Sequence, residues 1–264
     1  MGTLDQGADL AFDEPLSWMQ RRERRDAPSL VREALAQGRT QLVFQPVLSA
    51  TDPAVLLYHE ATLWLLDGAG RVIPPSLYAD LHEETELGRQ LDCATLTLAL
   101  DMLRAMPDLR LAINVSARSL ADCTWRRALE GGPSAFADFA ERLVLEIGEC
   151  SAIQLPEVVS RFMTDIEPRG ICCALDRFGG GVTAFRHLSR FLFDFAKIAP
   201  DVVSGIDTDP DRQVMAAALV AVARQFDMVL IADGVEREEE ARILRAMGVE
   251  FLQGGLFARP RFMA

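Results

Sequence analysis

The stretch CALDRFGGG (residues 173–181) joins a short apolar run, an acid, a base and three glycines. The apolar run suits a buried strand, and such a strand gains no stability from the carboxylate of Asp176 at its end. Asp176 therefore indicates a site, whereas the guanidinium of Arg177 stays charged at ordinary pH and coordinates no metal. No Gly-Lys-Ser/Thr follows the glycines, so we predict a hinge or a tight turn there rather than a phosphate-binding loop.

The same arrangement, an apolar run closed by a polar side chain, recurs along the chain. Eight runs read as strands: QLVFQPV (41–47), VLLYHEATLWL (55–65), LRLAINVS (109–116), RLVLEIGE (142–149), ICCALD (171–176), FDFAKIA (193–199), MVLIADGVE (228–236) and VEFLQGG (249–255). The polar side chains near their C-terminal ends are Glu60, Asn114, Glu146, Asp176, Lys197 and Asp233.

Amphipathic segments lie between these strands. Apolar residues at three-and-four spacing predict helices, most clearly at 87–102, 155–166 and 214–226. In the last of these, the predicted apolar face consists of Val214, Ala218, Leu219, Val222 and Phe226.

Alternating strands and helices predict a mostly parallel sheet, and two architectures fit. In an open doubly wound sheet the polar strand ends would spread along a line, so that six of them could not face one ligand. In a closed barrel they meet at one mouth, where the active sites of that fold lie. We therefore predict an α/β fold, a TIM-like (β/α)8 barrel. Its mouth would hold four acids, an amide and a lysine, which suits Mg²⁺ or Mn²⁺ and an anionic substrate.

Composition excludes several classes of protein. The 264 residues carry a formal net charge of −12 and a pI near 4.8, whereas nucleic acids and anionic lipids require a basic face, so we expect no DNA or RNA partner. The five cysteines show no C-x-x-C spacing, which indicates a reducing compartment, the cytoplasm. We expect no membrane segment in this chain, and its acidic start is unlike a signal peptide.

The beginning of the chain differs from the rest. It is polar, ends in the charge run RRERRD (21–26) and lacks a sustained apolar period. We predict a polar tether or peripheral helix over residues 1–28 and one barrel domain over residues 29–264.

Taken in order, the motifs resemble the EAL domain of bacterial cyclic di-GMP phosphodiesterases over roughly residues 30–260. The matching stretches are FQPVL (44–48), HEATLWL (59–65), INVSARSL (113–120), LVLEIGE (143–149), ALDRFGGG (174–181), FAKIAPDVV (195–203), IADGVE (231–236) and LQGGLFARP (252–260). The resemblance implies a barrel whose first strand runs antiparallel to the others.

In active members of that family, two metal ions at the mouth polarise one phosphodiester and activate the water that opens the cyclic dinucleotide. The resemblance implies a first metal position held by Glu60, Asn114, Glu146 and Asp176, and catalytic positions at Lys197 and Asp233. It places ligand-binding residues at Gln45, Trp64 and Gln253, and loop-supporting acids at Glu149 and Glu236.

Several positions depart from the family pattern. Arg177 stands where a second aspartate holds the second metal, and Asp233 replaces a glutamate, which shortens its reach by about one bond. Thr62 replaces the leucine of the Glu-Ala-Leu motif. Trp64 stands where the family usually has an arginine, and an indole can stack on a base but cannot pair with a phosphate.

Arg177 is the substitution we expect to disable hydrolysis. At about 4 Å and an effective dielectric constant near 20, a guanidinium and a divalent cation repel by roughly 8 kcal/mol before relaxation. We therefore expect Mg²⁺ or Mn²⁺ at one site at most, unless Arg177, as the strand neighbour of Asp176, turns its side chain out of the mouth.

Two main hypotheses follow. The first is a divergent EAL domain that is catalytically inactive or strongly impaired and acts in bacterial signalling, either as a cyclic di-GMP receptor or as a scaffold that binds a protein partner and needs no cofactor. The alternative is a metal-dependent phosphodiesterase that hydrolyses cyclic di-GMP to linear pGpG. A third is a barrel with another small-molecule substrate, since a fold alone fixes no function. By resemblance, we also expect a homodimer formed through barrel helices.

Overall fold

The structure is a computed structural model that describes residues 15–78, 85–131, 139–181 and 185–263. Its strands are β1 (Thr40–Ser49), β2 (Leu56–Leu66), β3 (Val72–Ile73), β4 (Leu111–Asn114), β5 (Leu143–Gly148), β6 (Cys172–Phe178), β7 (Phe195–Ile198), β8 (Val229–Ala232) and β9 (Phe251–Leu252). Its α-helices are α1 (Pro15–Ala36), α2 (Glu86–Ala105), α3 (Ala117–Ala121), α4 (Cys123–Glu130), α5 (Glu149–Gln154), α6 (Pro156–Ile166), α7 (Phe185–Leu188), α8 (Pro200–Val203), α9 (Pro210–Gln225) and α10 (Glu238–Met247).

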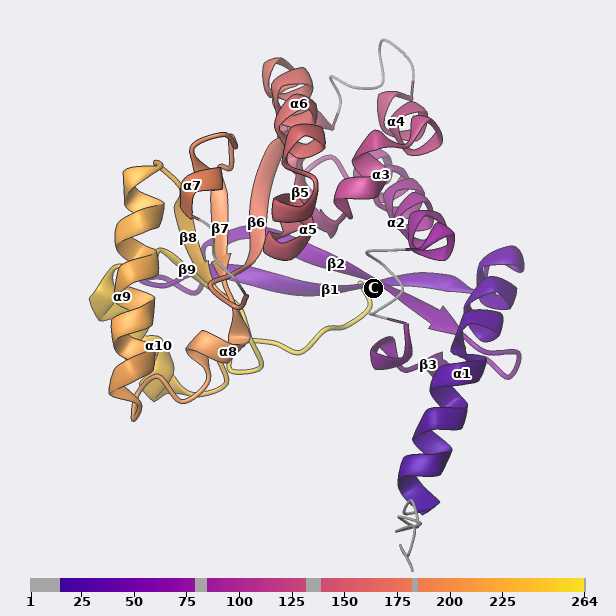
Figure 1. Cartoon of the computed structure of the whole chain (residues 1–264), viewed down its shortest axis with the longest axis horizontal. Helices are drawn as coiled ribbons and strands as arrows, with labels where there is room; N and C mark the ends of the chain where they lie inside the picture. Colours follow the sequence, from indigo (N-terminus) through magenta and orange to yellow (C-terminus); the bar gives the residue numbers. More distant parts are fainter. Residues whose placement is uncertain (1–14, 79–84, 132–138, 182–184, 264) are drawn as a thin grey trace, which may run out of the picture.

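Eight of the strands close into a barrel, with helices around it (Figure 1). The order around the ring is β1, β9, β8, β7, β6, β5, β4, β2 and back to β1, while β3 extends the sheet from β2. From β2 through β4 to β9 the ring neighbours are parallel, and β1 is antiparallel to both of its neighbours, β2 and β9. The predicted barrel with an antiparallel first strand is confirmed, and each of the eight predicted strand segments overlaps a barrel strand.

Side chains alternate along each strand between two hydrophobic cores, one between the barrel and the helices and one inside the barrel. On β2, Ala61, Leu63 and Leu65 face outward and belong to the core beneath the helices. Tyr58 faces inward, and it packs within the barrel in an apolar layer that also contains Val47, Ala112, Val144, Ala174 and Ile231. The barrel is therefore filled with side chains, and its mouth begins one layer above these residues.

Apolar periodicity predicted the buried face of helix α6 but not that of helix α9. On α6, Val159, Phe162 and Ile166 are buried, as predicted. On α9 the predicted face is wrong at Val214, which is 71% exposed, and at Ala218, which is exposed as well. The buried side chains of α9 are Ala216, Leu219, Val220 and Ala223. Because apolar residues occur all round this alanine-rich helix, its apolar spacing does not define one face. Contacts with the barrel determine which face is buried.

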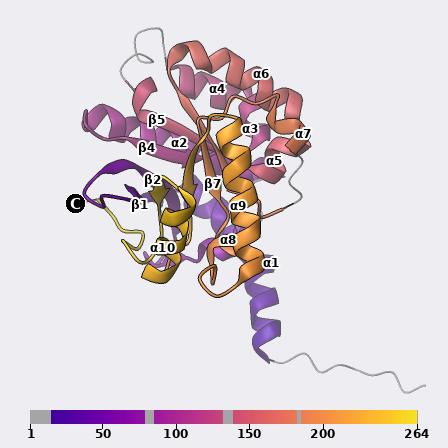
Figure 2. The ribbon, with the colours of Figure 1, turned by 90° about the vertical axis from the view of Figure 1, so that its left-hand side faces the viewer.

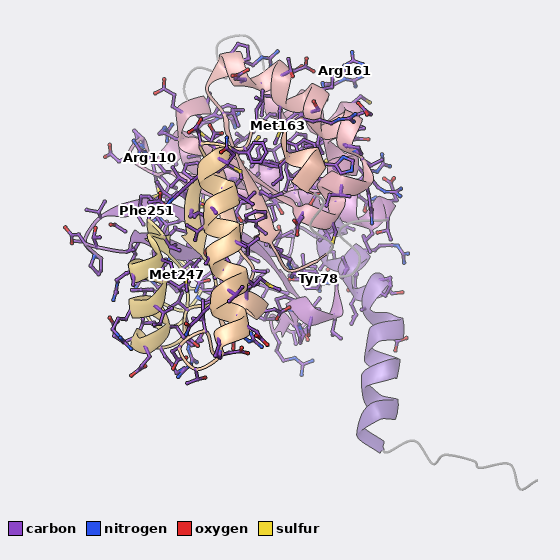
Figure 3. All side chains as sticks on the ribbon, turned by 60° about the vertical axis from the view of Figure 1, so that its left-hand side comes forward. Tyr78, Arg110, Arg161, Met163, Met247 and Phe251 are labelled. Carbon is purple, nitrogen blue, oxygen red and sulfur yellow. The ribbon has the colours of Figure 1, made fainter. Side chains whose placement is uncertain are left out.

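Helix α1 runs without a break through the predicted boundary at residue 28. Its C-terminal half contributes the buried residues Ala27, Val31 and Ala34, and its N-terminal half projects away from the barrel (Figures 1 and 2). Tyr78, which lies beside α1 in Figure 3, donates a hydrogen bond to the carbonyl of Leu63 at 2.9 Å. Residues 1–14 of the predicted tether lie outside the described residues, and the division at residue 28 stays a prediction.

The described residues contain neither a membrane-spanning helix nor a disulfide bond. No helix in the described ranges is long and apolar enough to cross a bilayer. All five cysteines carry free thiols, and Cys173 is buried in the core.

Candidate functional site

A layer of polar side chains lies directly above the apolar layer inside the barrel. Because successive inward residues on a strand are two apart, each of these side chains stands two positions from an apolar inward residue. The layer consists of Gln45, Glu60, Asn114, Glu146, Asp176, Lys197, Asp233 and Gln253. The structure thus brings the predicted metal, catalytic and closing-strand residues to one place.

Lys197 is the centre of this layer. Its ammonium group donates to Oε2 of Glu60 and to Oε2 of Glu146, both at 2.8 Å, and lies 3.9 Å from Oδ1 of Asp176. The Lys197 side chain is 1% exposed and that of Glu146 is fully buried. The three carboxylates and the ammonium group form one cluster. Because a buried charge requires partners, removing any one of these groups would leave another unpaired and destabilise the fold.

Burial and charge act on this cluster in opposite directions. Burial alone would lower the pKa of Lys197, but the charges of Glu146 and Glu60 raise that pKa well above its usual value, so the ammonium group stays charged. Burial, together with the charge of Glu60, raises the pKa of Glu146 well above its usual value. Burial would also raise the pKa of Glu60, yet the ammonium group of Lys197 keeps it below the usual value.

Neutral side chains complete the hydrogen bonding of Glu60. The amide of Asn114 donates to Oε1 of Glu60 at 2.9 Å, and that of Gln253 donates to Oε2 at 2.7 Å. Gln45 bonds to Gln253 at 3.3 Å and to the carbonyl of Ala258 at 2.9 Å.

Tyr58 was not among the predicted site residues, although its hydroxyl donates to Oε1 of Glu146 at 3.1 Å. The signal was present in the sequence, because Tyr58 precedes Glu60 by two positions and must share its face.

Arg177 lies in an irregularity of β6. The pairing with β7 shifts between Leu175 and Phe178, so that two residues, Asp176 and Arg177, lie where a regular strand would have one. Leu175 and Phe178 both face the outer core. The two residues between them therefore lie on the mouth side, and Arg177 does not alternate to the outside as a regular strand neighbour would.

The backbone and surroundings of Arg177 are unusual as well. Its φ is +56°, in the left-handed region that few non-glycine residues adopt. The side chain is exposed, and the guanidinium forms no ion pair with any residue in the described part of the chain. A fixed positive charge thus stands beside Asp176 at the mouth.

The remaining substituted positions also lie at the mouth. Asp233 follows β8, its Oδ1 accepts from the backbone N–H of Gly234 at 2.7 Å, and burial raises its pKa to about 6. Trp64 is the next inward residue after Thr62 on β2, and its ring meets that of Phe262 edge to face, with centroids 5.8 Å apart. The rim of the mouth is therefore aromatic at the position where the family usually has an arginine.

Glu149 and Glu236 contact the loops that they were predicted to support. Glu149, at the start of α5, is buried and accepts from the backbone N–H of Gly179 at 3.3 Å. Glu236 accepts from the backbone N–H of Gly255 at 3.2 Å, which joins the loop after β8 to the segment after β9.

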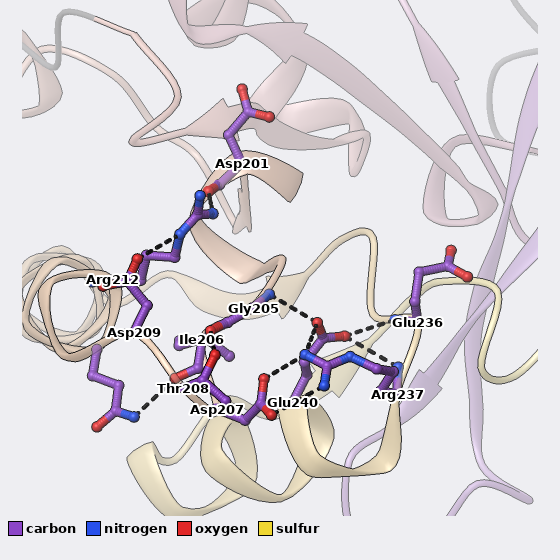
Figure 4. A network of polar contacts seen from close by, with 11 residues as sticks. Asp201, Gly205, Ile206, Asp207, Thr208, Asp209, Arg212, Glu236, Arg237 and Glu240 are labelled. Atoms are coloured by element: carbon purple, nitrogen blue, oxygen red, sulfur yellow. Dashed lines mark hydrogen bonds and ion pairs between the residues drawn. The ribbon is translucent and has the colours of Figure 1, made fainter.

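A further acid behind the mouth, Glu240, was not among the predicted site residues. It is 2% exposed and accepts from the backbone N–H groups of Gly205, Glu236 and Arg237 at 2.9 to 3.1 Å (Figure 4). Arg237 bonds to Glu240 and also to Asp207. This network fastens the turn after α8 to the loop that carries Asp233 and Glu236. Its only sequence signal was an acid in the first turn of a helix.

The predicted metal position has suitable donors but not a preformed cage. Glu60, Glu146 and Asp176 supply hard carboxylate oxygens, and Asn114 supplies an amide oxygen, which suits Mg²⁺ or Mn²⁺. Within the described residues, however, no three Asp, Glu, His or Cys side chains are arranged to hold a metal ion. The ammonium group of Lys197 lies where the carboxylates converge, so the donors fit a cation only if this group withdraws.

Known proteins share this architecture. The EAL domain family model matches residues 30–260, and the chain therefore belongs to the EAL domain family. The cyclic di-GMP phosphodiesterase PdeL of Escherichia coli is 27% identical over 238 residues, covering 88% of this chain and 66% of PdeL. This chain spans less than two thirds of the length of the curated relatives that it matches first.

Two solved structures resemble the barrel closely. One is the PaMucR phosphodiesterase in complex with c-di-GMP, with a TM-score of 0.79, 24% identity and coverage of 91% of this chain and 97% of that one. The other is the FimX EAL domain of Xanthomonas citri in complex with c-di-GMP, with a TM-score of 0.80, 21% identity and coverage of 93% and 97%. At these identities the likeness shows the shared fold.

Proposed function

We propose that this chain is an EAL domain that binds at most one divalent cation at its barrel mouth, has lost efficient hydrolysis of cyclic di-GMP, and acts as a receptor or regulatory module. The observation that carries the proposal is the position of Arg177 on the mouth side of the irregularity in β6. There its charge repels a second cation, and the carboxylate that would hold that cation is missing.

The charge of the mouth supports the same conclusion. Glu60, Glu146, Asp176 and Asp233 stand against Lys197 and Arg177, and these four carboxylates and two cations leave a formal charge of −2. One divalent cation neutralises that charge, and a second would leave an excess of positive charge. With an aspartate at position 177 the formal charge would be −4, which two divalent cations would neutralise.

A single cation would be held by Glu60, Asn114, Glu146 and Asp176, and when bound it would offset charge and polarise an oxygen of the phosphodiester. The chain's own residues would do the rest of the binding. The amides of Gln45 and Gln253 line the mouth, and Trp64 with Phe262 offers aromatic faces to a nucleobase.

Two measurements test the proposal. Purified protein is incubated with cyclic di-GMP and Mg²⁺ or Mn²⁺, and the linear dinucleotide is quantified. Turnover of about 1 per second or more, the range of an ordinary enzyme, would refute lost hydrolysis. Calorimetry with cyclic di-GMP then separates a receptor, which binds the dinucleotide, from a scaffold, which does not. Glu60→Gln, which removes a carboxylate from the mouth, is the matched control for binding there.

The alternative function is that of a metal-dependent cyclic di-GMP phosphodiesterase. The observation that favours it is the complete group of Glu60, Asn114, Glu146, Asp176 and Lys197 within one layer. The name of PdeL points the same way, and the hydrolysis assay decides between the two functions. A protein partner, a homodimer and a cytoplasmic location are further predictions, which pull-down, sedimentation and fractionation would check.

A further inference from the structure

Lys197 is the only lysine in the chain, beside twenty-six arginines. Every other side chain with a fixed positive charge is an arginine, including those in the exposed ion pairs of the helices. An ammonium group is a compact charge with three donors, whereas a guanidinium is a planar fork with five. The lysine thus occurs at the one position where a small cation must fit between inward-facing carboxylates.

The ammonium group contacts the oxygens that a divalent cation would need. It lies 2.8 Å from Glu60 and from Glu146, and 3.9 Å from Asp176. These are three of the four residues predicted to hold a metal, and the fourth, Asn114, bonds to Glu60. Two cations cannot share these oxygens at contact distance, because like charges in a buried site repel strongly.

We propose that Lys197 is a built-in competitor of the divalent cation, which binds to Glu60, Glu146 and Asp176 only when the ammonium group moves away from them. The proposal rests on the proposed function in one respect, namely that the mouth takes a single cation. In metal-free protein the ammonium group then stays paired with Glu60 and Glu146, and the fold does not depend on the metal.

Asp233 offers the ammonium group a second position. It is the fourth acid within electrostatic reach of Lys197. Its Oδ1 accepts only the N–H of its neighbour Gly234, and its other oxygen accepts no hydrogen bond from the described residues. A swing of the flexible lysine stem toward Asp233 keeps the charge paired while Glu60 and Glu146 turn to the cation.

The first test removes the competing charge. Lys197→Met keeps the length of the stem, and we expect it to bind Mn²⁺ about ten-fold or more tighter than the wild type, measured by calorimetry without dinucleotide. Arg126→Met, which removes a cation bonded to Asp165 on the outside of the barrel, should leave the affinity unchanged. Adding Glu60→Gln to Lys197→Met should abolish the gain. Equal or weaker binding by Lys197→Met, or a gain that survives Glu60→Gln, would overturn the proposal.

The second test uses the wild type, in case Lys197→Met leaves too many carboxylates unpaired to fold. Isotope-labelled lysine gives one side-chain signal from the single lysine. We expect this signal to shift as diamagnetic Mg²⁺ is raised to tens of millimolar, and an unchanged signal over that range would overturn the proposal. Neither test contains cyclic di-GMP. Rapid hydrolysis in a separate assay would therefore refute the proposed function and leave the competition standing.

Discussion

Replacing Arg177 by aspartate should restore a second cation position at the mouth. The change moves the formal charge of the mouth from −2 to −4, at the residue that adjoins Asp176 in the irregular stretch of β6. The backbone should accept the change, because φ is +56° and aspartate adopts this region more readily than arginine. The effect is therefore expected to be electrostatic rather than structural.

The magnitude follows from Coulomb's law at an ordinary contact distance. At about 4 Å and an effective dielectric constant near 20, one guanidinium repels a divalent cation by roughly 8 kcal/mol, and a carboxylate attracts it by a similar amount. Even if relaxation and solvent reduce the difference to about 2 kcal/mol, the affinity of the second cation changes by about 30-fold. Asp233→Glu is added because a shorter side chain misplaces its carboxylate by about one bond.

The assay is the stoichiometry of Mn²⁺ binding by equilibrium dialysis, followed by hydrolysis of cyclic di-GMP. We expect at most one cation per wild-type chain, two per Arg177→Asp/Asp233→Glu chain, and linear dinucleotide only from the double variant. Arg110→Asp makes the same change of charge just before β4, at the end of the barrel opposite the mouth, and should match the wild type. Two cations in the wild type, or one in the double variant, would refute the electrostatic reasoning.

Two further predictions concern the loops behind the mouth. Glu240→Gln should lower the free energy of unfolding by roughly 2–3 kcal/mol near neutral pH, measured in urea, because its carboxylate bonds to the turn after α8 and to the loop after β8. The exposed Glu239→Gln is the control. Burial would raise the pKa of Glu240, but hydrogen bonds from Gly205, Glu236 and Arg237 hold it below the usual 4.5. The loss of unfolding free energy in Glu240→Gln should therefore be full above pH 4.5 and shrink as the pH falls through the pKa of Glu240 in the folded protein. A loss that does not vary with pH would contradict this cause. Gly254→Ala should cost several times the roughly 1 kcal/mol of Gly70→Ala in thermal unfolding. Both glycines have positive φ, but a Cβ at Gly254 would lie 2.1 Å from the carbonyl oxygen of Val235, whereas a Cβ at Gly70 would meet no atom of the described residues within 4 Å apart from its chain neighbours. Equal costs would show that the close approach to Val235 is relieved.

The barrel and its polar layer could be predicted from local pattern. Strand runs closed by Glu60, Asn114, Glu146 and Asp176 carry the period of two that decides which side chains face inward. Because parallel strands of a closed barrel end at one mouth, their last inward residues meet whatever the loops do. Residue type and order were therefore enough to place these side chains together.

Three features required the folded molecule. The buried face of α9 depends on which alanines fit against the barrel, since apolar residues surround that helix. The network around Glu240 joins residues up to 35 positions apart, and its backbone donors leave no mark in the sequence. The contact of Lys197 with Glu60 spans 137 positions and depends on how strands far apart in the chain are staggered around the ring.

At Arg177, one property could be predicted from the sequence and another required the folded structure. Its identity, visible in the sequence, marks the missing carboxylate. Whether its charge faces the mouth was open, because strand alternation would turn the neighbour of Asp176 outward. The register shift between Leu175 and Phe178 decided it, and a register shift is a property of two paired strands that neither strand carries alone.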